Sequence, residues 1–181
     1  MDEHIDSLWS HLVRDPGSDP SGSPGIKYNT LLHLEYPYIV PGGRFREIYY
    51  WDSFFTILGL LADGKLKEAE YMVLNFSYLL KTYKMIPNGN RIYYLARSQP
   101  PFFALMVDII CRYKNDFSWG LQFLESLETE YSFWMNGLNK LSDMTPAIDR
   151  VVLLGSGKVL NRYYDFDEIP REESYKEDYR H

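Results

Sequence analysis

The chain is 181 residues long, enough for one domain with a hydrophobic core and at most a small second domain. Its formal net charge is −6 and its basic residues are scattered, which excludes a general binder of nucleic-acid backbones. No apolar stretch reaches the roughly 18–20 residues of a membrane span, and the acidic first residues are unlike a secretory signal. The sequence as written therefore predicts a soluble, cytoplasmic chain without a membrane partner. A missing N-terminal part would make the periplasm or secretion the alternative.

Aromatic residues make up 17% of the chain, which is more than a core alone requires. Tyrosine and tryptophan have an apolar face and a polar tip, so they suit surfaces that hold partly polar ligands. The single cysteine, Cys111, excludes an internal disulfide, and its apolar neighbours predict a buried side chain. The four histidines lack metal-ligand spacing, and we therefore expect no metal site.

The first and last predicted elements are small. Apolar residues at helical spacing predict a short amphipathic helix through residues 5–13. The next segment, Asp15–Gly25, consists almost entirely of turn-forming residues and is expected to be a loop or linker. Near the other end, a β-hairpin is expected within Val151–Tyr163, with Gly155-Ser156-Gly157 as its turn.

Two pairs of helices are predicted between these elements. They are Asp52–Asp63 with Lys65–Tyr83, and Pro101–Tyr113 with Phe117–Met135. The first helix of each pair is apolar nearly all round, whereas the second has one apolar face. A helix that is apolar all round must be covered on all sides, whereas an amphipathic helix faces water. Inner and outer helices in alternation predict an all-α fold, either a toroid or a solenoid of helix pairs.

The segments that lead into the two apolar helices repeat a pattern. Ile48–Phe55 recurs loosely as Ile92–Ser98, and each is preceded by a stretch with Pro, Gly and Arg, Pro41–Arg44 and Pro87–Arg91. A third copy, Asn161–Asp165, follows the predicted hairpin. The pattern predicts another inner helix after about residue 174, so we expect the chain to be an incomplete ring with an uncovered apolar face.

In such a ring, the leading segments gather at one end and line a shared pocket. Their residue types are Arg, Asn, Gln, Asp, Trp and Tyr, whose planar donors and acceptors suit vicinal hydroxyls. An aromatic face beside them can cover the C–H face of a sugar ring. Residue types alone therefore favour carbohydrate as the ligand class.

Simpler structural roles compete with sugar binding at several positions. Asp52 and Ser98 each lie just before an apolar helix, where either side chain would serve as an N-cap. Trp51 fits a core position as well as a sugar platform. Arg44 and Arg97 lie among apolar and aromatic residues, so each must find an acceptor.

One pair of carboxylates is close enough in sequence to suggest acid and base catalysis. Glu47 and Asp52 flank the aromatic stretch of the first leading segment. An inverting glycosidase requires its carboxyl groups roughly 6.5–9.5 Å apart, a separation that sequence spacing does not establish.

The segment Pro41–Phe55, reading PGGRFREIYYWDSFF, resembles the first signature of glycoside hydrolase family 37, the α,α-trehalases. The similarity continues through Met85–Arg91, Leu95–Met106, Leu160–Tyr164 and Arg171–Ser174, and so covers nearly the whole chain. The resemblance implies that residues 1–181 are the N-terminal-to-central portion of one (α/α)6 toroid domain. It also implies an enzyme that hydrolyses trehalose to two glucose molecules with inversion and needs no cofactor.

The resemblance assigns sugar contacts residue by residue. Family sugar-contacting positions fall on Arg44, Trp51, Asp52, Asn88, Arg97, Ser98, Gln99, Arg171 and Glu173. The family motif Arg-Pro-Glu reads Arg171-Glu172-Glu173 here, so the rigid middle position is changed. The family's general acid, an aspartate in a Gly-Trp-Asp segment, and its general base, a later glutamate, have no counterpart here and are expected beyond His181. By this comparison Glu47 and Asp52 become scaffold and ligand holder.

Two hypotheses follow. In the first, the chain is a portion of a trehalose hydrolase that binds trehalose or glucose and packs against the remainder of its own domain. In the second, it is a non-catalytic sugar-binding or helical interaction module that kept the same segments.

Overall fold

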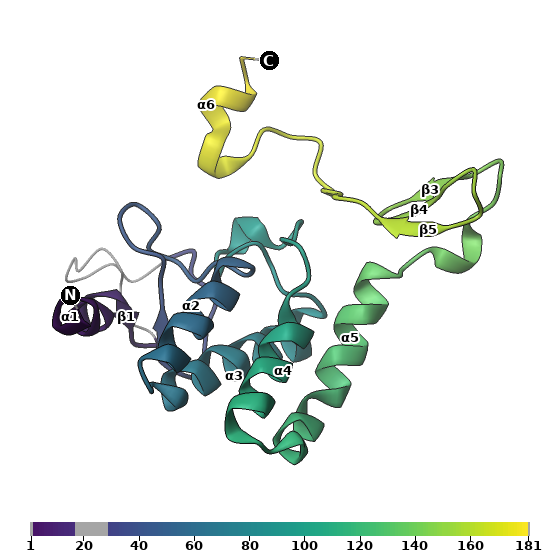
Figure 1. Cartoon of the computed structure of the whole chain (residues 1–181). Helices are drawn as coiled ribbons and strands as arrows, with labels where there is room; N and C mark the ends of the chain where they lie inside the picture. Colours follow the sequence, from purple (N-terminus) through teal and green to yellow (C-terminus); the bar gives the residue numbers. More distant parts are fainter. Residues whose placement is uncertain (1, 17–28, 181) are drawn as a thin grey trace.

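The computed structural model describes residues 2–16 and 29–180, with side chains from residue 7 onward. Helices dominate it, accompanied by two small antiparallel sheets (Figure 1). Helix α1 (Asp2–Leu12) opens the chain as predicted, and β1 (Val13–Arg14) pairs with β2 (Tyr38–Ile39). Most of the predicted loop Asp15–Gly25 lies outside the described residues.

The two predicted helix pairs are present. They are α2 (Asp52–Ala62) with α3 (Leu66–Tyr83), and α4 (Phe103–Lys114) with α5 (Leu124–Trp134). Gly64 ends α2 as predicted, with a φ of 70°, a left-handed conformation that glycine adopts without strain. Lys84 and Asn115 take the corresponding left-handed positions after α3 and α4.

The predicted start of the fourth helix, at Phe117, is wrong for the α-helix itself. Residues Phe117–Phe123 form a 3-10 helix, η2, and the α-helix begins only at Leu124. Within this 3-10 helix, Gly120 packs closely on α4. A Cβ at Gly120 would lie only 2.9 Å from Sγ of Cys111. Cys111 itself is buried, as predicted. Three shorter 3-10 segments are η1 (Ile92–Tyr94), η3 (Leu138–Lys140) and η4 (Glu172–Ser174).

Helix α3 is the centre of the described body. It contacts α2, α4, α5 and β2 and buries residues on most of its circumference, among them Met72, Phe76 and Leu80. The helices expected to be covered on all sides, α2 and α4, instead bury one face each. On α2, Phe55 is 58% exposed although its ring meets those of Phe54 and Phe102, and on α4, Leu105 is 49% exposed. The uncovered apolar face predicted for an incomplete ring is therefore present.

Beyond α5 the chain forms a three-stranded sheet, β3 (Ala147–Ile148), β4 (Val151–Leu153) and β5 (Val159–Asn161). The predicted hairpin is confirmed as β4 and β5, and β3 adds a strand that sequence reasoning missed. From β5 the chain runs back above the helices to α6 (Tyr175–Asp178), a single turn where a further helix was predicted (Figure 1). None of the described helices combines the length and apolar character needed to cross a bilayer.

Candidate functional site

Two loops that lead into α2 and α4 lie side by side. We call residues 41–51 loop A and residues 87–102 loop B. The amide of Tyr50 donates to the carbonyl of Asn88 at 3.2 Å, and the amide of Asn90 donates to the carbonyl of Ile48 at 3.3 Å. The buried Asn90 side chain accepts from the amide of Ile48 at 2.9 Å, so the loops are joined by backbone and side chain. The repeated segments of the sequence thus meet at one end of the helices.

A partly buried ion pair holds the same loops together. Arg91 of loop B donates through Nε to Oε1 of Glu47 of loop A at 2.8 Å, and its Nη2 contacts the same oxygen at 2.5 Å. Tyr49 donates to the other carboxylate oxygen at 3.3 Å. Glu47 is 9% exposed and fully engaged, which supports a scaffolding role rather than one in acid and base catalysis.

Tyr50 connects the loops to α5. Its hydroxyl donates to Oε1 of Glu130 and accepts from the amides of Phe102 and Phe103, each at 2.8 Å. Burial raises the pKa of Glu130 to about 7, and the hydrogen bond from Tyr50 opposes that rise. Tyr50 therefore fixes the first turn of α4 relative to both loop A and α5.

Trp51 and Gln99 bring the ends of the two loops into contact. The side-chain oxygen of Gln99 accepts from the amide of Trp51 at 3.0 Å. Trp51 is 42% exposed and touches Phe102 edge to face, so it is available as a platform rather than being a core residue. Asp52 is the first residue of α2, with Trp51 in the N-cap position, and Phe102 occupies the N-cap position of α4. The N-cap alternatives for Asp52 and Ser98 are therefore wrong, since the helices begin elsewhere.

Arg97 has the densest set of charged contacts at this end. Its Nη1 lies 3.0 Å from Oδ2 of Asp165, and its Nη2 contacts Oε1 of Glu173. The guanidinium also lies over the ring of Tyr94, 5.4 Å from its centroid. Burial alone would lower the Arg97 pKa, but the hydrogen bonds to Asp165 and Glu173 outweigh it and raise that pKa. The acceptor that the sequence required for Arg97 is thus supplied by the C-terminal segment.

Asn88 and Ser98 lie close to Arg97 along loop B. The amide of Asn88 donates to the carbonyl of Arg97 at 3.0 Å, and its side-chain oxygen is 3.5 Å from the hydroxyl of Tyr163. Ser98 is buried and donates to the carbonyl of Gln99 at 3.0 Å. Loop B therefore gathers four of the predicted sugar-contacting residues.

Two predicted residues stand apart from this group. Arg44 lies after the Gly42-Gly43 turn, is exposed and stacks on Phe45 with 4.8 Å from its guanidinium carbon to the ring centroid. Among the described residues it has no buried acceptor of the kind that its apolar neighbours suggested, because the turn projects it to the surface. Arg171 forms a two-pronged pair with Asp178, at 2.7 and 2.8 Å, within the C-terminal segment.

Sequence reasoning missed two members of the site, Asp165 and Glu130. Asp165 ends the third copy of the leading pattern, directly after its Tyr163-Tyr164 pair, and this repeat was the available signal. Glu130 lies on a helix for which the sequence predicted only an amphipathic pattern. No neighbouring residue in the sequence indicated that its partner would be a tyrosine 80 residues away. In the described ranges, no group of three or more His, Cys, Asp and Glu side chains could hold a metal ion.

Comparison with known proteins gives the family. The trehalase family model matches residues 1–181. The chain belongs to the trehalase family. It is 48% identical over 176 residues to the periplasmic trehalase of Shigella flexneri and equally to a putative periplasmic trehalase of Escherichia coli O157:H7. Each match covers 97% of this trehalase-family chain and 30% of the relative's length.

A solved structure is also similar. Neutral trehalase from Saccharomyces cerevisiae superposes with a TM-score of 0.54 and 29% sequence identity. The match covers 96% of the present chain and 30% of the yeast chain. The trehalase-family chain thus spans about a third of the relatives that it matches.

Proposed function

We propose that this chain is the sugar-binding portion of an α,α-trehalase, which hydrolyses trehalose to two glucose molecules with inversion. The observation that carries the proposal is the arrangement around Arg97. A buried guanidinium with two carboxylate partners lies in one loop with Asn88, Ser98 and Gln99. Charged donors and acceptors of this kind bind sugar hydroxyls more strongly than neutral groups do.

The binding wall extends from Arg97 to loop A. Gln99 connects loop B to Trp51, and Asp52 follows at the first turn of α2, where free amide groups favour acceptor oxygens. Trp51 offers an exposed aromatic ring for the C–H face of a glucose unit. Arg44 and Arg171 would approach from the turn after Gly43 and from the C-terminal segment.

We further propose that the helix pairs are part of an (α/α)6 toroid. The alternation of α2, α3, α4 and α5 and the uncovered faces of α2 and α4 support this architecture. In that toroid the general acid and general base come from residues beyond this chain. The acid and base are expected on opposite sides of the scissile bond, roughly 6.5–9.5 Å apart.

The names of two relatives support a proposal for the compartment. Those from Shigella flexneri and Escherichia coli are named as periplasmic, and we propose the periplasm in place of the cytoplasm favoured by the sequence as written. Fractionation of the source cells, followed by detection of the protein with an antibody, tests this placement.

Glucose release from trehalose tests the proposed activity. The purified chain of 181 residues is expected to release none, whereas a longer protein from the same source that carries this chain releases glucose. Glucose release by the 181-residue chain would show that it carries its own catalysts. Failure of the longer protein to cleave trehalose, combined with saturable trehalose binding, would favour the non-catalytic binding module.

A sharper test uses Arg97. In the longer protein, Arg97→Lys is expected to weaken trehalose binding at least tenfold, because an ammonium cannot contact two carboxylates and a sugar with the geometry of a guanidinium. The matched control is Arg112→Lys, at an exposed arginine paired with Asp108 on α4. Equal losses in the two variants would contradict a sugar-binding role for Arg97.

A further inference from the structure

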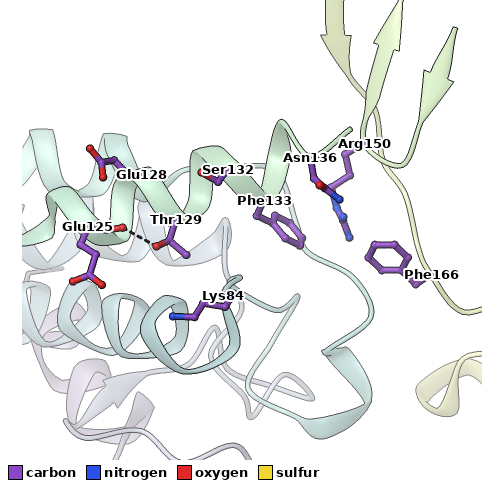
Figure 2. A pocket seen from close by; sticks show the side chains of 9 residues that line it. All are labelled: Lys84, Glu125, Glu128, Thr129, Ser132, Phe133, Asn136, Arg150 and Phe166. Carbon is purple, nitrogen blue, oxygen red and sulfur yellow. Dashed lines mark hydrogen bonds between the residues drawn. The ribbon is translucent and has the colours of Figure 1, made fainter. Parts of the chain in front are cut away.

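A cavity of about 540 Å³ lies beside α5 and is lined by none of the candidate sugar-binding residues (Figure 2). Most of its wall comes from α5 and the residues just after it. Lys84 follows the end of α3, Arg150 comes directly before β4 in the chain, and Phe166 comes after β5. The volume lies within the roughly 300–1,000 Å³ typical of small-molecule sites. The cavity is therefore large enough for a ligand distinct from trehalose.

Arg150 is the unusual residue of this cavity. Its side chain is among the most deeply buried of the described residues, and the residue is 1% exposed. The guanidinium lies between two rings, with its carbon 3.9 Å from the centroid of Phe133 and 4.7 Å from that of Phe166 (Figure 2). Its Nη2 is buried and has no hydrogen-bond partner among the described residues.

An unpaired, buried guanidinium N–H is energetically unfavourable. Leaving a buried polar group without a partner costs about 1–3 kcal/mol, and more when the group is charged. Cation–π contact with Phe133 and Phe166 offsets part of this cost but supplies no hydrogen-bond acceptor. The group that satisfies Nη2 must therefore present an acceptor oxygen, and an anionic one matches the charge.

The rest of the lining limits what the anion is attached to. Ser132 on α5 provides a hydroxyl, and Asn136, just beyond the end of α5, provides an amide whose nitrogen donates to Asp149 at 3.2 Å. Glu125 and Glu128 provide carboxylates further along the helix (Figure 2). Those carboxylates repel a second anionic group but accept hydrogen bonds from hydroxyls. The lining thus favours one anionic group at the Arg150 end and hydroxyl groups at the other.

We propose that this cavity binds a small polyol that carries one phosphate or carboxylate group. The anion pairs with the guanidinium of Arg150, and the polyol hydroxyls extend along α5 to the hydroxyl of Ser132, with Glu125 and Glu128 excluding a second anionic group from the far end. Phe166 covers the guanidinium, is 51% exposed and lies in the irregular segment after β5, so its ring turns aside as the anion enters. This site shares no lining residue with the proposed trehalose site.

Calorimetric titration of the purified chain tests the proposal with three probes of similar size: glycerol 3-phosphate, glycerate and glycerol. We expect saturable binding of one or both anions, and binding of glycerol at least tenfold weaker. The anion that binds more tightly identifies the acidic group. Inorganic phosphate is the fourth probe, and an affinity equal to that of glycerol 3-phosphate would overturn recognition of the polyol.

Two variants remove the site in different ways. Arg150→Met removes the charge and keeps an apolar side chain between the rings, and Ser132→Trp fills the cavity from an exposed helix position without touching Arg150. Each is expected to weaken anion binding at least tenfold. Their controls are Arg112→Met, at an exposed arginine on α4, and Tyr131→Trp, at the neighbouring position of α5, 65% exposed and not lining the cavity. Unchanged binding in Ser132→Trp, a variant that keeps the buried arginine, would overturn the proposed location.

Discussion

The hydroxyl of Tyr50 donates to the carboxylate of Glu130, and this contact joins loop A to the middle of α5. The same oxygen accepts from two amides at the start of α4. One tyrosine therefore sets the relative positions of three elements that carry or support the candidate sugar site.

Replacing this hydroxyl is expected to destabilise the fold. Tyr50→Phe leaves Glu130 and the amides of Phe102 and Phe103 without their partner, and unsatisfied buried groups cost about 1–3 kcal/mol each. Urea unfolding followed by circular dichroism measures the loss. Tyr131→Phe, at an exposed tyrosine, is the control and is expected to leave the midpoint unchanged. Equal midpoints for the two variants would show that the hydroxyl contributes nothing.

The pH dependence of stability is expected to report on Glu130. Its folded-state pKa of about 7 lies above the ordinary 4.5, so the native state binds more protons than the unfolded state between these values. The free energy of unfolding therefore falls as pH rises from 4.5 towards 7, by at most roughly 3.5 kcal/mol at about 1.4 kcal/mol per pKa unit.

Glu130→Gln isolates this effect, because the amide keeps a hydrogen-bond acceptor and cannot ionise. Urea midpoints at several pH values between 4.5 and 8 are compared for the two proteins. We expect the variant to gain stability relative to the parent as pH rises. Parallel curves for the two proteins would contradict a raised pKa at Glu130.

The contacts of Arg97 predict how the C-terminal segment is held. Arg97→Met removes both ion pairs to Asp165 and Glu173, so amide hydrogen exchange in residues 165–174 is expected to accelerate at least tenfold. Arg171→Met removes only the local pair with Asp178 and is expected to affect residues 171–178 alone. Mass spectrometry of peptides resolves the two ranges. Unchanged exchange at 165–170 in the Arg97 variant would mean that other contacts hold the segment.

The close approach of the loops gives a prediction at Gly89. A Cβ there would lie 3.0 Å from Cε2 of Tyr94 and 3.1 Å from the carbonyl oxygen of Ile48. Gly89→Ala is therefore expected to separate the loops and lower stability by about 1–3 kcal/mol. Gly155→Ala is the matched control, because a Cβ at that position meets nothing within 4 Å. Thermal unfolding compares the two, and equal melting temperatures would contradict tight packing at Gly89.

The helices were predictable from sequence because their signals are local. The apolar periodicity of α3 and the stop at Gly64 each depend on residues within a few positions. The 3-10 start at Phe117–Phe123 depends instead on how Gly120 packs against Cys111, which no periodicity records. The coverage of α2 and α4 likewise depends on which other helices are present, and their own periodicity does not record it.

In the candidate site, too, some features depend on local sequence and others depend on the fold. Loop sequences indicated Asn88, Arg97, Ser98 and Gln99, and the structure brings these residues into one loop. The partners of Arg97 lie 68 and 76 residues further along the chain, and only the fold places them beside it. The separation of Arg44 from a buried acceptor likewise follows from the direction of the Gly42-Gly43 turn.

The central position of α3 has a consequence for cooperativity. Because α2, α4, α5 and β2 all pack on this one helix, any opening that exposes Phe76 must disrupt every one of those contacts together. The helical body is thus expected to unfold as a single unit. The sheet β3–β5 and α6 share few contacts with α3 and can open on their own at lower free energy. Most of the proposed sugar-binding wall therefore adjoins the most persistent part of the molecule, whereas Arg171 and Glu173 arrive from its most transient part.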